Sequence, residues 1–216
     1  MNQPKPKAFA TFREERGRNY RTSTYIQWGP ASVTRSLGSA LLLNPGSAAL
    51  FQARPAAGRS IMGQVTLDPT MQQLVRFTEA IYQNRPLEGR FYIFNLFSLQ
   101  NPSASDAIAC FEQLVENGET TLEAQLASRE ELRKQPWIML GWGCLQRKSR
   151  PHFSALKAMW QKQIASASVP AFGKRCSNGQ DYYHPCPRLY AMREPLLRDL
   201  VALYQQNVHT LPSSFV

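Results

Sequence analysis

Residues 39–46 read SALLLNPG, a short apolar run that ends at an Asn-Pro-Gly turn. Small and apolar residues without polar alternation predict a buried strand over 39–43. Proline and glycine directly afterwards predict that the strand stops there. Asn44 is therefore expected just beyond the carboxyl end of a buried strand, which is where open α/β sheets bind their ligands.

Outward from this stretch, short apolar strands alternate with helices. Further strands are predicted at 25–28, 90–97, 137–140 and 169–172. Helices are predicted at 68–82, 105–117, 151–164 and 195–207, with a more acidic one approaching Lys134. Such alternation predicts an α/β fold whose sheet is largely parallel and covered on both faces.

The length of 216 residues predicts one domain. Residues 1–24 are polar and charged, with two prolines, and we expect a basic N-terminal arm there. Residues 25–216 then form a single α/β domain. The segment 47–67 has little periodicity and is predicted to be a long loop, a type of segment that often carries function.

Charge is the unusual feature of the composition. Lys and Arg number 25 against 15 Asp and Glu, a net charge of +10 that favours a polyanionic partner. Residues 16–67 and 132–180 contain no acid, whereas acids between 106 and 131 are opposed only by Arg129. This segregation predicts one basic and one acidic face, although a solvated surface with an accidental excess would give the same counts.

Several classes of protein are disfavoured by the sequence. The lysines near the start have no apolar core behind them, so we expect no secretory signal, and no apolar run has the length of a membrane span. The cysteines form no CxxC pair and no regular framework; they are Cys110, Cys144, Cys176 and Cys186. We expect a reduced, cytoplasmic monomer without membrane contact.

Four short motifs follow the predicted strands. They are Leu43-Asn44-Pro45-Gly46, Phe94-Asn95-Leu96, Leu140-Gly141-Trp142-Gly143 and His184-Pro185-Cys186-Pro187-Arg188-Leu189. Taken singly, each motif has an ordinary structural explanation. The four explanations are, in order, a tight turn, an asparagine hydrogen-bonded to the backbone, a buried strand that ends at glycine, and a histidine with a structural role. In this order they resemble the uracil-DNA glycosylase superfamily, with a first motif like that of its mismatch-specific branch. Together with Asp68-Pro69-Thr70 they also resemble an uncharacterised bacterial family with the same order of motifs.

The resemblance implies a three-layer α/β sandwich around a central, mainly parallel four-stranded sheet. It also implies a monofunctional DNA glycosylase, which flips a base out of DNA and hydrolyses its N-glycosidic bond to leave an abasic site. Asn44 and His184 would be catalytic: Asn44 would orient the water, and His184 would donate to the departing base as negative charge grows on it. Asn95 would bind the edge of a pyrimidine.

Three further residues are candidates for the base pocket: Pro45, Gly46 and Phe51. Phe51 would stack on the base. The uracil-specific branch has a bulky tyrosine at the position of Gly46, so glycine leaves room for a substituent on carbon 5. We therefore expect a damaged or 5-modified pyrimidine, hypermodified bases of bacteriophage DNA included, with repair and defence both open as roles.

The DNA itself, single- or double-stranded, is the expected partner. Candidate phosphate ligands are Arg147, Lys148 and Arg150, and Arg188 or Leu189 would fill the gap left by the flipped base. Cys186 departs from the usual serine of the last motif, and Arg188 is inserted before its leucine. No cofactor or metal is expected, because Cys176, His184, Cys186 and His152 match no zinc or iron–sulfur spacing.

Two alternative functions remain open from the sequence. One is a non-catalytic nucleic-acid-binding protein on the same fold. The other is a glycosidase that acts on free nucleosides or nucleotides, which would not need the charge of +10. Steep salt dependence of DNA binding favours a polymer substrate, and a flat one favours the small molecule.

Overall fold

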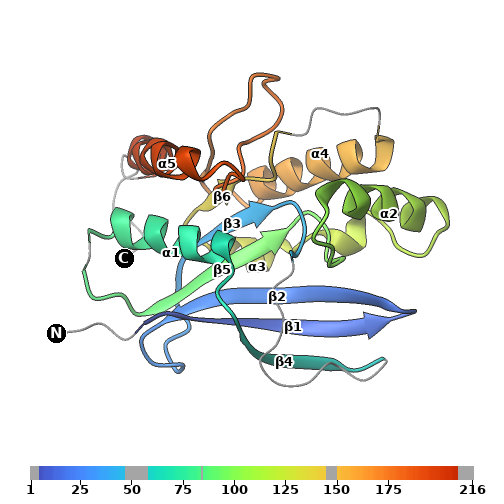
Figure 1. Ribbon diagram of the computed structural model, residues 1–216, viewed down its shortest axis with the longest axis horizontal. Helices are drawn as coiled ribbons and strands as arrows, with labels where there is room; N and C mark the ends of the chain where they lie inside the picture. The colour runs from blue at the N-terminus through green and yellow to red at the C-terminus, as the bar shows by residue number, and fades with distance from the viewer. Residues whose placement is uncertain (1–4, 47–57, 84, 145–149, 209–216) are drawn as a thin grey trace.

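A single mixed sheet of seven strands, in the order β4-β1-β2-β5-β3-β6-β7, forms the centre of the molecule (Figure 1). The computed structural model describes residues 5–46, 58–83, 85–144 and 150–208. The strands are β1 Lys7–Glu15, β2 Arg18–Trp28, β3 Ser36–Leu42, β4 Ser60–Val65, β5 Gly89–Asn95, β6 Ile138–Leu140 and β7 Ala171–Phe172. The helices are α1 Pro69–Ile81, α2 Ala104–Glu116, η1 Glu123–Gln125, α3 Arg129–Arg133, α4 Pro151–Ser166, η2 Tyr190–Met192 and α5 Arg193–Asn207.

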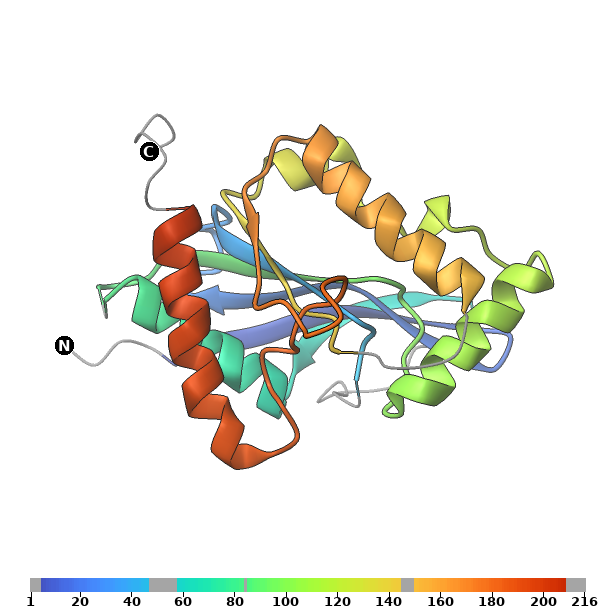
Figure 2. The same ribbon diagram turned by 90° about the horizontal axis from the view of Figure 1, so that it is seen from above.

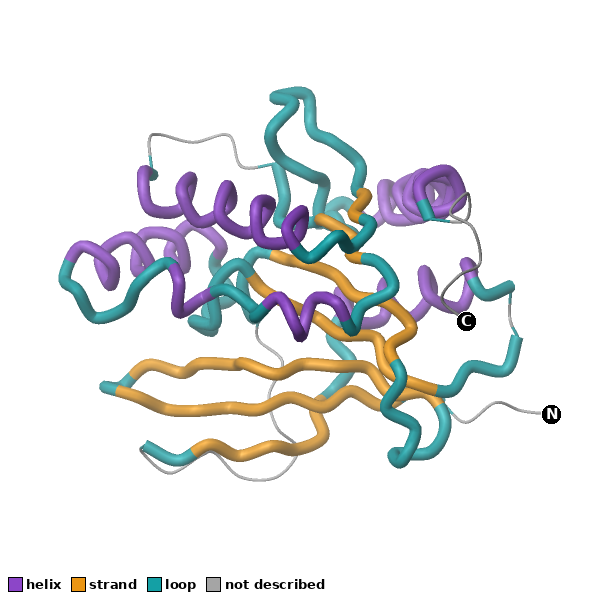
Figure 3. Tube along the Cα trace, turned by 180° about the vertical axis from the view of Figure 1, so that it is seen from behind, coloured by secondary structure: helices purple, strands orange, loops and turns teal. Residues whose placement is uncertain are grey.

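The expected α/β class is confirmed, but the expected extent of the sheet is wrong. Strands β5, β3, β6 and β7 are neighbours and pair in parallel. Strands β2, β1 and β4 extend this group with antiparallel pairing. Figure 3 shows these three strands on one side of the molecule, with the helices gathered around the parallel part.

The prediction of an N-terminal arm at residues 1–24 is wrong for residues 7–15 and 18–24, because they belong to strands β1 and β2 of the sheet. The sequence of β1 alternates, and Ala8, Ala10 and Phe12 are buried while their neighbours are more exposed. Period-two alternation is the pattern of a half-buried strand, and charged residues on the open face concealed it. Similarly, the segment predicted as a long loop contains β4, which pairs with β1.

Two core clusters lie on opposite faces of the sheet. On one face, α1 and α5 pack against Ile26, Leu42 and Trp137. On the other, α2, α3 and α4 pack against Leu41, Leu96 and Leu140 (Figure 2). Adjacent residues of β3, Leu41 and Leu42, enter different clusters because successive side chains of a strand point to opposite faces.

The predicted helices are present within a few residues of their predicted bounds, with one exception. Asp68 caps α1 and Ser103 caps α2. The acidic segment before Lys134 forms the short η1 and the five-residue α3, which begins with a capping box of Ser128 and Glu131. Among the described residues, no helix combines the length and apolar character needed to cross a membrane.

Candidate active site

The carboxyl ends of β3, β5 and β6 meet at one edge of the sheet. Leu42 at the end of β3 pairs with Asn95, the last residue of β5, and Leu41 pairs with Leu140 at the end of β6. Asn44 follows β3 by two residues, and Gly143 follows β6 by three. The structure therefore places Asn44, Asn95 and Gly143 at the same edge.

The side-chain amide of Asn44 faces three backbone carbonyl groups. Nδ2 lies 3.0 Å from the oxygen of Pro45, 3.4 Å from that of Leu99 and 2.8 Å from that of Asn101. Carbonyl oxygens only accept hydrogen bonds, so the NH₂ group must face them and Oδ1 must point elsewhere. No described residue donates to Oδ1, which leaves it as a fixed acceptor at the edge of the sheet.

The segment 98–101 also supports the turn after Asn44. The N–H of Asn101 donates to the oxygen of Pro45, and Nε2 of Gln100 lies 2.9 Å from the oxygen of Gly46. Pro45 is buried and Gly46 half-buried. A Cβ added at Gly46 would meet no atom of the described residues within 4 Å, its chain neighbours aside, so among these residues the position has room for a side chain or a ligand.

Asn95 is half-buried, and its side chain forms no hydrogen bond within the described ranges. It lines an open cavity of about 850 Å³ that runs along β2 and β5 beside η1 and α3. Arg21, Ser98 and Trp160 also line this cavity, whereas Asn44 and His184 do not. Of the predicted site residues that the structure describes, the cavity lining thus includes Asn95 alone.

His184 lies in the segment that follows β7, beside the carboxyl end of β6. Its Nδ1 is 3.2 Å from the nitrogen of Cys186 and 3.1 Å from the oxygen of the same residue. Burial lowers the pKa of His184, against the opposing effects of the Cys186 backbone and the Asp68 carboxylate. Since an ordinary histidine pKa is about 6.5, the ring is neutral at pH 7.

Nδ1 of His184 lies near a group that only donates, the N–H of Cys186, and near a group that only accepts, the carbonyl oxygen of the same residue. These two contacts call for opposite tautomers of the neutral ring. No described residue forms a hydrogen bond with Nε2, so in the tautomer with its hydrogen on Nε2 His184 presents a free N–H donor.

Close packing fixes the backbone around His184. A Cβ on Gly141 would lie 2.8 Å from Cδ of Pro185, so glycine is needed for the two segments to approach. The N–H of Gly143 donates to the oxygen of Tyr182 at 2.8 Å. The glycines of the third motif therefore let the histidine segment lie against the end of β6.

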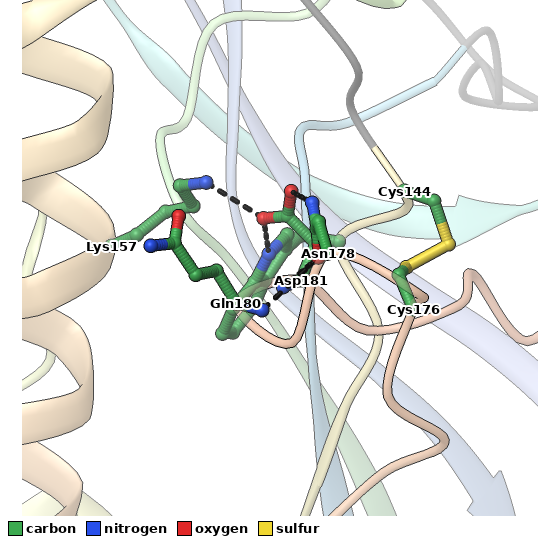
Figure 4. Close-up of a disulfide and its surroundings, with 7 residues drawn as sticks. Cys144, Lys157, Cys176, Asn178, Gln180 and Asp181 are labelled. Carbon is green, nitrogen blue, oxygen red and sulfur yellow. Dashed lines mark hydrogen bonds and ion pairs between the residues drawn. A yellow bond between two sulfur atoms is a disulfide. The ribbon is translucent and has the colours of Figure 1, made fainter.

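A buried polar cluster anchors the same segment to α4 and to the residue after β6 (Figure 4). Asp181 accepts hydrogen bonds from Lys157 at 2.7 Å, Trp142 Nε1 at 2.8 Å and Asn178 at 2.7 Å. Burial acts to raise the pKa of Asp181, but these donors outweigh burial and the pKa is lowered. Asp181 is thus a charged carboxylate that ties three elements together. Sequence reasoning missed it because two of its partners, Trp142 and Lys157, are distant along the chain.

A disulfide joins Cys144, after β6, to Cys176 in the same segment (Figure 4). The expectation of a fully reduced protein is therefore wrong for these two residues, and Cys176 is not free to bind a metal. Disulfides are rare in reducing compartments. The spacing of 32 residues carried no recognisable pattern, since only the tertiary structure brings the two thiols together.

Asp68 is a residue whose place at this edge the sequence did not reveal. Its Oδ1 accepts from the N–H of Met71 at 2.8 Å as the cap of α1. Its negative charge also acts to raise the pKa values of Arg21 and His184. The helix predicted at 68–82 does begin beside this residue, since Pro69 is the first residue of α1, but nothing in the local pattern indicated these longer contacts.

The predicted DNA ligands are only partly described. Phe51, Arg147 and Lys148 lie outside the described residues. Arg150 is exposed and precedes α4, and Arg188 and Leu189 are exposed beyond the histidine. Four exposed large apolar side chains fall in this segment: Tyr183, Leu189, Tyr190 and Met192. Exposed apolar residues gathered in one segment typically mark a binding surface.

One group of possible metal ligands occurs within the described ranges: Glu112, Glu116 and His152, with ligand atoms within 4.8 Å of one another. Glu112 is buried, and its Oε1 accepts from the N–H of Phe153 at 2.7 Å. Arg150 provides no side-chain cap for α4. We therefore explain Glu112 as the cap that α4 lacks locally.

Comparison with known proteins does not extend this description. The chain matches no family model, and neither the curated proteins nor the solved structures gave a match. The functional argument therefore rests on the residues themselves.

Proposed function

We propose that the protein is a DNA glycosylase that extrudes a damaged or 5-modified pyrimidine and hydrolyses its N-glycosidic bond. One observation carries the proposal. Asn44, Asn95 and His184 lie at the carboxyl edge of the parallel strands, and each offers a polar atom that no described residue engages. Ligands of open α/β sheets bind at this edge, and unsatisfied polar groups there are suited to a polar ligand.

Each group has a defined task in the hydrolysis. The transition state has an oxocarbenium-like sugar, while negative charge grows on the departing base. Oδ1 of Asn44 accepts a hydrogen bond from water and orients it toward the anomeric carbon. Because an amide is a poor base, turnover is slow. Nε2–H of His184 donates to a carbonyl oxygen of the base as its charge grows, and removal of such a donor costs about 100- to 1,000-fold in rate.

Asn95 gives the choice of base, since its amide both donates and accepts. The space that the described residues leave at Gly46 would accommodate a substituent on carbon 5 of the pyrimidine. The four neighbouring parallel strands accord with the central sheet implied by the motifs. The charge of +10 and the exposed apolar residues after His184 accord with a DNA partner.

A base-release assay tests the proposal. Oligonucleotides and bacteriophage DNA with modified pyrimidines are incubated with the protein, and free base and abasic sites are measured by mass spectrometry and alkali cleavage. His184→Asn should lower release about 100-fold or more, because its shorter amide does not reach the place of Nε2 and the donor to the base is lost. Asn95→Asp should change the preferred base, since a carboxylate only accepts.

The controls separate chemistry from folding. Asn207→Asp makes the same chemical change at the exposed end of α5 and should leave release unchanged. Asn44→Ala is unsuitable as evidence of catalysis, since it also removes the hydrogen bonds to residues 45, 99 and 101. Tight DNA binding without release on every substrate would instead favour the non-catalytic binding protein.

A further inference from the structure

The antiparallel part of the sheet is covered by helices on one side only. On that side, Ala8 and Ile26 belong to the core cluster over which α1 and α5 pack. On the other side, the cluster under α2, α3 and α4 includes no residue of β1 or β4 within the described ranges. Figure 3 shows β1, β2 and β4 lying apart from these helices.

Strand register gives the side chains on the uncovered side. Since Ala8 points toward α1, its neighbour Phe9 points away. Phe9 pairs with Tyr25, and Tyr25 pairs with Tyr92 of β5, so three aromatic residues lie side by side across three strands. Farther along the same side, Thr11 of β1 pairs with Met62 of β4, which is 56% exposed. We call the surface of Phe9, Thr11, Tyr25, Met62 and Tyr92 the open face.

The rings of the open face form a continuous row. The ring centroids of Phe9 and Tyr25 are 5.3 Å apart, and those of Tyr25 and Tyr92 are 6.1 Å apart. Tyr25 in the middle is buried, with the guanidinium carbon of Arg90 4.4 Å from its ring centroid. Phe9 and Tyr92 are half-buried and keep part of their surface free. The solvated side of an antiparallel sheet is usually polar, so such a row indicates a binding surface.

The open cavity of about 850 Å³ adjoins the open face at Tyr92. Phe94, two residues farther along β5 and therefore on the same side, lines the cavity together with Trp160 of α4. The ring centroids of Phe94 and Trp160 are 6.1 Å apart. A cavity of this volume is in the range of small-molecule sites, so a planar group as large as a nucleobase has room beside Tyr92.

Cations surround the row of rings. By strand alternation, Lys7 and Arg13 share the side of β1 that carries Phe9, and both are exposed. Arg90 lies over Tyr25, and Lys134 lines the cavity. A surface that combines aromatic rings with cations is complementary to a ligand that combines flat bases with phosphates.

The acids nearby leave these cations available. Arg13 pairs with Glu15 and Lys134 with Glu130, and the four side chains are between 47% and 82% exposed. Exposed ion pairs contribute little free energy, so a phosphate can replace the carboxylate. Glu131, which lines the cavity, already accepts hydrogen bonds in the capping box of α3.

We propose that the open face and the adjoining cavity bind single-stranded DNA, with bases stacked on Phe9 and Tyr92 and phosphates at the surrounding cations. Bases of a single strand expose their faces, whereas those of a duplex are covered by their neighbours in the stack. An aromatic platform beside cations is a common way of holding single strands. The surface goes beyond the proposed chemistry, since Asn44 and His184 take no part in it. Only the choice of DNA over RNA rests on the proposed function.

The cavity also extends toward the candidate active site. Ser98 lines it, and the carbonyl oxygen of the next residue, Leu99, lies 3.4 Å from Nδ2 of Asn44. A strand held on the open face would therefore lead toward the carboxyl edge of the parallel strands. In a glycosylase, the open face would hold the DNA on one side of the extruded nucleotide.

Fluorescence anisotropy with a labelled oligodeoxyadenylate of about 12 nucleotides tests the surface. Adenine is a purine, so excision of a pyrimidine does not enter the measurement. Tyr92→Leu and Phe9→Leu should each weaken binding about tenfold or more, because leucine keeps apolar bulk but cannot stack on a base. Unchanged affinity of both variants would refute the proposal.

Two further variants and a duplex separate stacking from folding. Tyr92→Phe keeps the ring and should retain the affinity. Tyr204→Leu makes the same change in a half-buried tyrosine of α5 on the other side of the sheet and should also retain it. A blunt duplex of mixed sequence should respond far less to Tyr92→Leu than the single strand does. An equal loss for duplex and single strand would make the ring structural and contradict the proposal.

The salt dependence of the same binding tests the cations. Each phosphate contact of a single strand contributes about −0.7 to the slope of the logarithm of the binding constant against the logarithm of the salt concentration. Lys7→Gln with Arg13→Gln should therefore flatten the slope, whereas Arg198→Gln, at an exposed position of α5, should leave it unchanged. Equal slopes for all proteins would contradict phosphate contacts at these cations.

Two results would assign the open face to another occupant and overturn the proposal. One is tighter binding of the matching RNA oligonucleotide. The other is a dimer, measured by light scattering, that forms in the wild type and is lost in Tyr92→Leu. None of these measurements follows base release, so failure of the glycosylase hypothesis and failure of the open face are distinguishable.

Discussion

Single residues at the carboxyl edge combine structural and chemical tasks. Asn44 holds the segment 99–101 through its NH₂ group and leaves Oδ1 as an acceptor. An aspartate has the same shape but no hydrogen to donate, so it would face three carbonyl oxygens with negative charge. The carbonyl oxygens around residue 44 therefore explain why it is an asparagine rather than an aspartate.

Asn44→Asp should accordingly lower the free energy of unfolding by about 1–3 kcal/mol, the usual cost of leaving buried groups unpaired. Urea unfolding followed by circular dichroism measures the change. Asn19→Asp is the matched control and should change stability little, because Asn19 is exposed on β2 and its side chain forms no hydrogen bond within the described ranges. Unchanged stability of Asn44→Asp would show that the amide does not anchor the segment.

Gly46→Tyr is the test of space in the base pocket. Within the described part of the chain, no atom other than those of the neighbouring residues lies within 4 Å of a Cβ at this position, so the variant should fold with near-native stability. In the proposed function, the ring would block substituents on carbon 5 and stop release of 5-modified pyrimidines while sparing uracil. Full activity of Gly46→Tyr on 5-substituted bases, measured by base release, would end the steric argument.

At the scale of elements, the segment between β7 and α5 carries His184 on very little regular structure. It is held by the Cys144–Cys176 disulfide, by Asp181 and by its contacts with Gly141 and Gly143. An ion pair between Lys174 and Asp199 also joins it to α5. Because η2 is the single helix within this segment, such links are needed to hold a side chain in place.

Breaking the buried pair of Asp181 and Lys157 should be costly. Their side chains are 3% and 17% exposed, and Asp181→Asn would leave the lysine charge without its partner. We expect a loss of about 3–5 kcal/mol in the free energy of unfolding. Asp199→Asn removes one partner of a far more exposed pair, and its cost should stay below about 1 kcal/mol.

The same pair predicts a pH dependence. The pKa of Asp181 is lowered in the folded protein, so its contribution to stability is present above the unfolded pKa of about 3.9 and is lost as the pH falls through the folded value. Wild-type protein should therefore lose stability below about pH 4 more steeply than Asp181→Asn. Parallel urea midpoints for the two proteins from pH 6 to pH 2.5 would argue against this.

Reduction of the disulfide should loosen the histidine segment. The bond spans 32 residues, and closing a loop of this size contributes about 3–4 kcal/mol by restricting the unfolded chain. Cys144→Ser with Cys176→Ser should lower the unfolding temperature, and dithiothreitol should do the same to the wild type alone. Cys110→Ser alters a free cysteine and is the control.

At the scale of the whole molecule, charge and exposed apolar surface favour a large anionic partner. The protein has a net charge of +10. If its cations bind the phosphates of duplex DNA, each phosphate contact contributes about −0.9 to the slope of the logarithm of the binding constant against the logarithm of the salt concentration. We expect a steep slope for a DNA duplex, measured by fluorescence anisotropy between low and moderate salt. A flat slope would favour a free nucleoside or nucleotide as the substrate.

Local patterns in the sequence were sufficient for the α/β class and for the positions of the polar motifs. The run before Asn44, the aromatic strand before Asn95 and the Asp68-Pro69 helix start are signals within a few residues, and β3, β5 and α1 form where they indicate. Because parallel strands end at a common edge, the shared location of Asn44 and Asn95 followed from those signals.

Tertiary structure alone decided the rest, because it depends on contacts between residues distant in the chain. Strand β1 is stabilised by pairing with β2 and β4, and local analysis cannot see these contacts. Because the open face of β1 is charged, local analysis interpreted the strand as a polar arm. The carbonyl partners of Asn44 lie 55 and 57 residues away, and the partner of Cys144 lies 32 away. The burial of Arg21 is of the same kind: a charged residue in a polar stretch becomes an uncompensated cation only when the sheet closes around it.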